Sequence, residues 1–294
     1  MKVYKFGGAS VKDADGIRNL KQIVSEQKGD LVVVVSAMGK TTNALERVVN
    51  ALWLREYEQV EREWQSINNY HQSVCRELNI SLPLEMPETD VSSQSYDELY
   101  DQVVSWGEIF STRIVSRYLS LVGVDNEWKD MTELLLTDDT FRQAHVDIAV
   151  SGRRWRKAIM SAEIGTHLWI TQGFIGGTND GRRTTLGREG SDYSAALLAN
   201  MLHADSVTIW KDVPGVLTAD PRKDRSATLI KELDYSDATR LAESGAQIIH
   251  KKTIEPLIEK DIPLYVKPFA NPQAAGTVIH STKQRLLTQV NWGK

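Results

Sequence analysis

The 294-residue sequence has few of the features that mark secreted or membrane-bound proteins. Cys75 is the only cysteine, so no disulfide can form within the chain, which fits a reducing compartment. No apolar run approaches the ~20 residues that a transmembrane helix needs. The N-terminus leads straight into a strand-like run and not into the layout of a signal peptide. We therefore expect a cytoplasmic protein that has no contact with a membrane.

The sequence also lacks a strong excess of charge of either sign. Its 35 Lys and Arg residues and 39 Asp and Glu residues give a net charge of -4. Proteins that bind nucleic acid usually concentrate positive charge, and here only the segment Ser151–Met160 is strongly basic. A single basic helix on a mildly acidic protein is more typical of a solvated surface, so we expect no nucleic-acid partner.

Strand and helix patterns alternate from the N-terminus. The apolar run Met1–Tyr4 predicts a strand, the spacing over Asp13–Ser25 predicts a helix, and Leu31–Val35 has the continuous apolar character of a buried strand. This order predicts an α/β fold with a parallel sheet and right-handed crossovers. Further strands are predicted at Val122–Trp128, Leu134–Thr137, Leu168–Thr171, Ser206–Trp210, Ile262–Val266 and Thr277–Ile279, and further helices at Ser151–Met160, Tyr193–Leu202, Ser236–His250 and Lys252–Glu259.

Residues 44–121 interrupt this alternation. Residues 44–81 and Tyr96–Leu121 have helical spacing, and the polar segment Leu82–Ser95 between them predicts a loop. We interpret this region as a helical insertion that forms a lid or a dimer contact. A glycine inside a helix costs about 1 kcal/mol relative to alanine, so Gly107 indicates close approach of another group. Glu108 beside it is a candidate ligand for a cationic amine, and the alternative is a solvated carboxylate.

The segment Lys5–Ser10 is typical of a phosphate cradle. The adjacent Gly7 and Gly8 follow a strand and precede a helix, which lets backbone N–H groups and the helix dipole approach an anion. Lys5 places a positive charge at the same turn. A tight strand-to-helix connection without a ligand is the alternative interpretation.

A second glycine-containing loop, Ser36–Asn43, follows the buried strand Leu31–Val35. Its Gly39-Lys40-Thr41 sequence suggests a Walker A motif, but that motif needs a glycine where Val34 stands, so we reject a P-loop. The hydroxyl groups of this loop still lie at the carboxyl end of a strand, where ligands bind in open α/β sheets.

The long segment Gln172–Asp192 is rich in glycine and arginine and is predicted to be a loop. It ends at Ser191 and Asp192, at the N-terminus of a predicted helix, which favours an anion. Arg188 just before can clamp a carboxylate with two hydrogen bonds. The alternatives are a helix cap for Ser191 and a surface charge for Arg188.

A further loop, Lys211–Arg222, follows the strand Ser206–Trp210. Its Pro-Gly and Asp-Pro pairs predict turns that leave Lys211, Asp212 and Arg222 at a carboxyl strand end. We expect this loop to face a nucleotide.

The order and spacing of these segments resemble those of the aspartokinases, within the amino acid kinase family. The resemblance rests on Lys5–Ser10, Ser36–Asn43, Trp106–Glu108, Thr171–Phe174, Thr185–Tyr193 and Lys211–Arg222. It implies a three-layer α/β sandwich with a mainly parallel central sheet, similar to carbamate kinase, and a helical insertion. The catalytic domain would span residues 1–282, with 44–121 on the aspartate side and about 171–282 on the nucleotide side, before a tail at 283–294.

The resemblance also implies the reaction and the site. ATP with Mg²⁺ would phosphorylate the β-carboxylate of L-aspartate, the first step towards lysine, threonine and methionine, in a homodimer with no metal site of its own. Lys5 and Asp192 would be catalytic. The residues implied for ATP are Lys5, Phe6, Gly7, Gly8, Ser10, Lys211, Asp212, Leu217 and Arg222, and those implied for aspartate are Thr42, Glu108, Phe174, Arg188 and Ser191.

Three positions depart from the family pattern. Ala9 stands where threonine is usual, and Glu189 stands where glycine is common. Gln247 occupies the position of a lysine that faces the ATP phosphates in many relatives. Losing that cation would cost about a few kcal/mol of transition-state stabilisation unless Lys211 or Lys251 replaces it.

The sequence ends at Lys294 without the ACT regulatory domains that usually follow in aspartokinases. We therefore expect no feedback inhibition by lysine or threonine through its own tail. Two alternatives stay open for the function. One is a kinase of the same fold for another small carboxylate or a nucleotide, and the other is an ATP-binding regulatory subunit with weakened turnover. Glu108 together with Arg188 favours an amino acid substrate.

Overall fold

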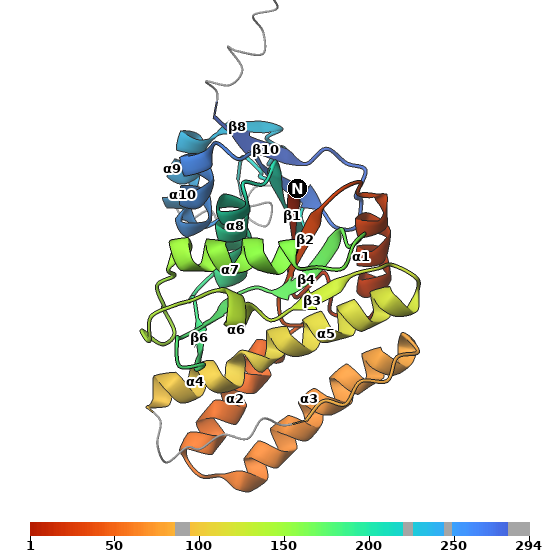
Figure 1. Ribbon diagram of the computed structural model, residues 1–294, viewed down its shortest axis with the longest axis vertical. Helices are drawn as coiled ribbons and strands as arrows, with labels where there is room; N and C mark the ends of the chain where they lie inside the picture. The colour runs from red at the N-terminus through yellow and green to blue at the C-terminus, as the bar shows by residue number, and fades with distance from the viewer. Residues whose placement is uncertain (86–94, 220–225, 244–248, 282–294) are drawn as a thin grey trace, which may run out of the picture.

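The computed structural model describes residues 1–85, 95–219, 226–243 and 249–281. The strands of its main sheet are β1 (Lys2–Phe6), β2 (Leu31–Val35), β3 (Glu127–Lys129), β4 (Leu168–Gln172), β7 (Ser206–Lys211), β8 (Glu232–Asp234), β9 (Leu264–Pro268) and β10 (Thr277–His280). They lie in the order β3-β4-β2-β1-β7-β9-β10-β8, and only β9 and β10 run antiparallel to each other (Figure 1). The mainly parallel sheet is therefore confirmed.

Helices cover both faces of this sheet. They are α1 (Ala14–Glu26), α2 (Thr41–Trp53), α3 (Tyr57–Glu77), α4 (Tyr96–Val104), α5 (Trp106–Leu121), α6 (Met131–Leu134), α7 (Ile148–Met160), α8 (Gly190–Leu202), α9 (Tyr235–Glu243) and α10 (Lys251–Lys260). Val32 and Val34 of β2 belong to one buried cluster, with α7, α8 and α10. Val33 and Val35 belong to another, with α1, α5 and the end of α3. This division explains why every residue of β2 is apolar and confirms the three-layer sandwich.

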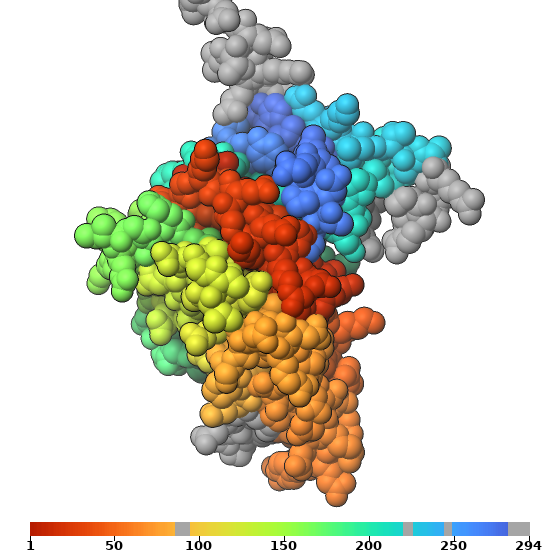
Figure 2. Space-filling model, turned by 90° about the vertical axis from the view of Figure 1, so that its right-hand side faces the viewer, coloured from red at the N-terminus to blue at the C-terminus, as the bar shows by residue number. Residues whose placement is uncertain are grey.

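The N-terminal strand lies in the middle of the sheet. Strand β1 lies between β2 and β7, and β7 pairs in turn with β9. In Figure 2 the N-terminal segment (red) lies beside a segment from the later part of the chain (blue). The N-terminal glycine turn therefore lies at the centre of the carboxyl edge of the sheet and not at its margin.

The described part of the insertion, residues 44–85 and 95–121, forms four helices, whereas two long ones were expected. The first segment is divided into α2 and α3 by a turn at Arg55, which has a φ of 60°. The second is divided into α4 and α5 at Ser105. Helices α2, α3 and α4 enclose a small core of their own, which includes Leu45, Val49 and Leu99. They form the lower end of the molecule (Figures 1 and 2).

Several predicted boundaries were wrong. The segment 122–128 yields only β3, and the predicted strand Leu134–Thr137 instead contains the end of α6 and two isolated bridges. The segment Gln172–Asp192 is not a simple loop, because β5 (Ile175–Gly177) and β6 (Arg183–Thr185) pair as an antiparallel hairpin within it. Strand β8 was not predicted. The predicted helix Ser236–His250 corresponds to α9, and His250 caps the next helix, α10.

Gly107 marks a close contact between α5 and the loop after β2, as the sequence indicated. A methyl group added at Gly107 would lie 2.9 Å from Cβ of Ala37 and 3.3 Å from Cδ1 of Leu45. Normal carbon contacts are about 3.5–4.0 Å. The glycine therefore lets the insertion reach the carboxyl edge of the sheet and carries Glu108 with it.

We predict that Gly107→Ala lowers the free energy of unfolding by about 1 kcal/mol or more, because overpacking outweighs the gain in helix propensity. The matched control is Gly152→Ala in α7, where the added methyl group would approach only the end of the Arg156 side chain closely, at 3.2 Å. That variant should be as stable as the parent chain or more stable. Denaturant titration of both variants measures the difference, and equal stabilities would contradict the close contact at Gly107.

Candidate active site

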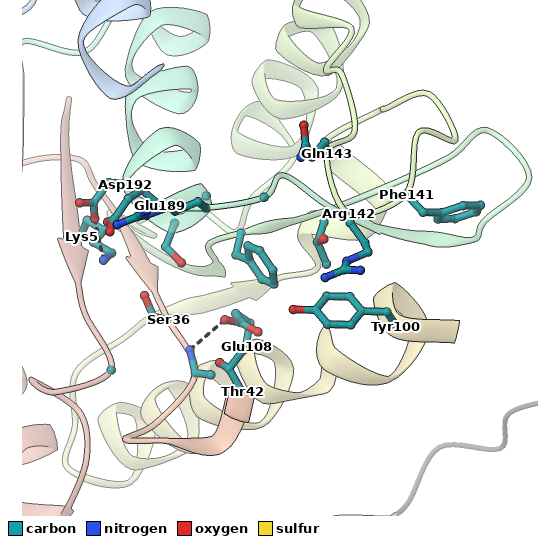
Figure 3. Close-up of a pocket in the computed structure, with 18 of the residues that line it drawn as sticks. Lys5, Ser36, Thr42, Tyr100, Glu108, Phe141, Arg142, Gln143, Glu189 and Asp192 are labelled. Carbon is teal, nitrogen blue, oxygen red and sulfur yellow. Dashed lines mark hydrogen bonds and ion pairs between the residues drawn. The ribbon is translucent and has the colours of Figure 1, made fainter. Parts of the chain in front are cut away.

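A pocket of about 840 Å³ opens at the carboxyl edge of the sheet. Figure 3 shows Lys5 and Asp192 at one end, Ser36 and Glu108 in the middle, and Tyr100 at the other end. Strand β1, the loop after β2, helices α4 and α5 and the first turn of α8 supply these groups. Of the predicted residues, those that line the pocket are Lys5, Gly8, Thr42, Glu108, Phe174, Arg188, Ser191 and Asp192.

The glycine turn after β1 is joined to the loop after β2. The N–H of Gly39 donates to the carbonyl oxygen of Gly8 at 3.0 Å. A Cβ atom at Gly8 would lie 2.4 Å from the carbonyl oxygen of Ala37, so only glycine fits at this contact. The N–H of Ser10 donates to the carbonyl oxygen of Gly7 and closes the turn. Both loops therefore present backbone at the floor of the pocket.

The side chain of Phe6 lies elsewhere. It is fully buried and stacks on Trp210 in the core, with ring centroids 6.1 Å apart. Phe6 can therefore offer a ligand only its backbone. Ser10 is 4% exposed and does not line the pocket.

Asp192 forms ion pairs with two lysines at one end of the pocket. The Lys5 ammonium lies 2.6 Å from Oδ1 of Asp192, and the Lys211 ammonium lies 3.1 Å from Oδ2. Burial alone would raise the pKa of Asp192, but the two ammonium groups outweigh burial and hold that pKa below its usual range. The carboxylate thus stays charged in the interior and fixes one cation from β1 and one from β7.

Glu108 is in the opposite electrostatic situation. It is 3% exposed, and its Oε1 accepts a hydrogen bond of 3.2 Å from the N–H of Ala37. Oε2 has no hydrogen-bond partner among the residues that the structure describes. Burial raises the pKa of Glu108 to about 8, against smaller opposing effects that include the charge of Lys5. The interpretation of Glu108 as a solvated surface carboxylate is therefore wrong.

The first turn of α8 approaches β4 closely. A Cβ atom at Gly173 would lie 2.6 Å from Cβ of Ser191, so this glycine allows the approach. Ser191 is the second residue of α8, and the cap position belongs to Glu189, which has a left-handed backbone with φ 57°. The alternative that Ser191 caps this helix is thus wrong. Arg188 and Glu189 are exposed and line the pocket.

The predicted nucleotide-side residues are not brought together in this pocket. Lys211 does not line the pocket but pairs with Asp192, which does. Asp212 is exposed, and Leu217 forms an isolated bridge with Leu229. Lys211 is the last residue of β7, the strand beside β1, and Asp212 and Leu217 come after it in the chain. Arg222 and Gln247 lie outside the described residues, as does the tail at 283–294.

The sequence did not indicate the outer end of the pocket. The guanidinium of Arg142 lies 4.4 Å from the ring centroid of Tyr100, and its Nη1 lies 3.1 Å from Oδ1 of Asp97. Tyr100 and Asp97 belong to α4, whereas Arg142 lies in a segment with no glycine motif. No sequence signal brings these two regions together, because their contact arises from tertiary packing.

The part of the chain that the structure describes was searched for a metal site and for a membrane-spanning helix. No group of three or more His, Cys, Asp or Glu side chains is arranged to hold a metal ion there. Within the same residues, no helix has the length and apolar character to cross a membrane.

Comparison with known proteins gives consistent results. The lysine-sensitive aspartokinase 3 of Escherichia coli (strain K12) is 37% identical over 292 residues, which cover 94% of this chain and 63% of that protein. The crystal structure of E. coli aspartokinase III in complex with aspartate and ADP superposes with a TM-score of 0.84 at 33% identity, over 96% of this chain and 64% of that one. The chain thus spans just under two thirds of the length of these relatives.

More distant structures share the fold alone. An isopentenyl phosphate kinase superposes with a TM-score of 0.56 at 15% identity, over 95% of this chain and all of that one. The sequence profile of the amino acid kinase family matches residues 1–268, which include every strand of the pocket floor. The chain therefore belongs to the amino acid kinase family.

Proposed function

We propose that the protein is an aspartate kinase, which transfers the γ-phosphoryl group of ATP to the β-carboxylate of L-aspartate. The observation that carries the proposal is the buried carboxyl group of Glu108, whose Oε2 lacks a hydrogen-bond partner among the described residues. A buried polar atom without a partner is costly. The ammonium group of an amino acid satisfies it, and Arg188 in the same pocket then suits a carboxylate of that substrate.

The lysine end of the pocket suits the transferring phosphoryl group. Lys5 and Lys211 bring two positive charges to one buried carboxylate, which leaves the group with a net positive charge. The first turn of α8 adds the positive end of a helix dipole at Ser191. Lys5 would neutralise the γ-phosphoryl group, while Asp192 holds the lysine in place.

The chemistry asks little more of the protein. The β-carboxylate of aspartate is already a nucleophile, so no general base is required, and catalysis consists of positioning and charge neutralisation. Mg²⁺ would arrive with ATP and neutralise its phosphates. Both oxygens of Asp192 already pair with ammonium groups, so this carboxylate serves the lysines. The site therefore fits a metal carried by the nucleotide better than one held by the protein.

The relatives support the same assignment. The E. coli aspartokinase III structure was determined with aspartate and ADP, and 94% of this chain aligns with the E. coli enzyme sequence. We infer that the product, 4-phospho-L-aspartate, enters the synthesis of lysine, threonine and methionine. We further propose a cytoplasmic homodimer, which light scattering on the purified chain would test.

The alternative functions differ in their substrates. A kinase for a nucleotide, or for a carboxylate without an ammonium group, would not use a buried carboxyl group as an ammonium ligand. An ATP-binding regulatory subunit would bind ATP without releasing ADP. The regulatory-subunit alternative is motivated by Gln247, which stands in place of a lysine and lies outside the described residues.

We predict ADP release that depends on L-aspartate and not on glutamate, carbamate or UMP. Aspartate has two carboxylates and an ammonium group that suit Arg188, Lys5 and Glu108. Carbamate and UMP have no ammonium group, and the extra methylene of glutamate would displace the carboxylate that accepts the phosphoryl group. A coupled assay of ADP release with each acceptor at equal concentration measures this selectivity. ATP binding without release of ADP would favour the regulatory subunit instead.

We predict that Lys5→Met lowers kcat by roughly 100-fold or more, since it removes a cation from the transferring phosphoryl group. Lys211 remains to partner Asp192, so the variant should stay folded. The matched control is Lys2→Met, on the same strand but in a different, smaller cavity of about 480 Å³. Steady-state kinetics and circular dichroism compare the two, and a folded Lys5→Met protein with near-normal kcat would refute the role of Lys5.

We predict that the KM for aspartate falls as the pH rises from about 6 to about 8. The raised pKa of Glu108, about 8, means that the free protein holds this group mostly protonated at neutral pH. An ammonium ligand needs the ionised form, whose fraction grows about tenfold per pH unit below the pKa. In Glu108→Gln the KM should be high and should not vary with pH through this group. A parallel pH profile in both proteins at saturating ATP would contradict the assignment.

A further inference from the structure

A second buried carboxylate lies behind the outer wall of the pocket. Asp101 in α4 is fully buried and does not line the pocket. Its Oδ2 accepts hydrogen bonds from the N–H of Arg142 at 2.9 Å and from the N–H of Thr185 at 2.7 Å. Its Oδ1 accepts a bond of 2.7 Å from the hydroxyl group of Thr185. One side chain therefore receives three donors from two distant segments.

The two segments both form walls of the pocket. Phe141, Arg142 and Gln143 line it on one side, and Thr185, with Gly187 and Arg188 just after it, lines it on another. The segments also contact each other, because the N–H of Ala144 donates to the carbonyl oxygen of Thr185 at 3.0 Å. Asp101 thus joins the helical insertion to both walls from behind.

The backbone of Arg142 is held in an uncommon conformation. Its φ of 68° is in the left-handed region, which is unfavourable for a residue other than glycine. In this conformation its N–H points at Asp101, and its carbonyl oxygen would lie 3.0 Å from a Cβ atom at Gly187. The backbone of Arg142 therefore lies close to Gly187, the residue that precedes Arg188.

We propose that Asp101 is a positioning residue for the acceptor substrate, which fixes the wall that carries Arg188 relative to Glu108 without touching the substrate itself. The inference rests on the proposed function of the pocket. Asp101 acts by accepting hydrogen bonds and not through its charge, because its three donors, two backbone N–H groups and one hydroxyl group, are uncharged.

This distinction sets the pair of variants. In Asp101→Asn the amide oxygen can take the place of Oδ2 and accept both N–H groups, while the amide nitrogen donates to the hydroxyl group of Thr185, which can rotate to accept. In Asp101→Ala all three donors lose their partner. Each buried donor left unsatisfied costs about 1–3 kcal/mol, so the two segments should move until water or another acceptor reaches them.

The kinetic test compares the KM for aspartate with that for ATP. We expect Asp101→Ala to raise the aspartate KM by at least about tenfold and the ATP KM by less than about threefold. Asp101→Asn should keep both within about twofold. The matched control is Glu98→Ala, which removes another carboxylate of α4 and its 3.4 Å contact with Arg182, and which should also stay within about twofold. If the alanine variant does not fold, Asp101→Ser, which keeps one acceptor, is measured instead.

Hydrogen exchange without substrates tests the hydrogen bonds themselves. The amides of Arg142 and Thr185 should lose protection in Asp101→Ala, or in Asp101→Ser where that replaces it, and keep it in Asp101→Asn. Should the parent chain release no ADP with aspartate, the proposed function fails, while exchange still decides whether Asp101 holds the two walls. An unchanged aspartate KM in the alanine or serine variant, or an asparagine variant as impaired as the alanine one, would overturn the inference.

Discussion

The structure depends on a carboxylate that is charged in the protein interior. Asp192 is almost fully buried, and it can remain ionised there only because the ammonium groups of Lys5 and Lys211 meet it at 2.6 and 3.1 Å. The dependence is mutual. Two lysines from neighbouring strands would repel each other without the carboxylate between them. Removing either lysine leaves a buried charge with one partner fewer, so the first turn of α8 and the centre of the sheet hold each other in register.

The second carboxyl group of the pocket, that of Glu108, has its pKa shifted in the opposite direction. Glu108 is as deeply buried as Asp192, but it has one backbone N–H as its partner, and its pKa is raised to about 8 where that of Asp192 is lowered. Two acids with pKa values pushed in opposite directions are a frequent mark of functional sites. The opposite pKa shifts of Asp192 and Glu108 suit two different roles. Under the proposed function, Asp192 would keep in place the lysines that meet the phosphate, while Glu108 would stay mostly neutral at neutral pH until a cationic ligand arrives.

The sequence predicted the parts of this site that depend on local chemistry. The strands β1 and β2, the glycine turn, and the position of Ser191 and Asp192 at the N-terminus of a helix all follow from short-range patterns. Boundaries were less accurate, because β5 contains two adjacent glycines, which have little strand propensity, although it pairs with β6 in a hairpin. The contacts of Asp101 with Arg142 and Thr185 could not be predicted at all. They join residues 41 and 84 positions apart, and no periodicity encodes such a distance.

Three glycines show how the local and distant parts meet. Gly8, Gly107 and Gly173 each allow an approach that a single methyl group would block: to Ala37 O, to Ala37 Cβ and to Ser191 Cβ. Their neighbours in the chain carry functional groups, Gly107 beside Glu108 being the clearest case. The insertion, the glycine turn and α8 thus each pack closely against a neighbouring segment through a glycine at the pocket floor. Since such contacts leave little room for adjustment, the distance between Glu108 and the lysine pair is fixed by this packing. Adjustment is then left to the long side chains of the outer wall, whose backbone at Arg142 and Thr185 is held by hydrogen bonds to Asp101.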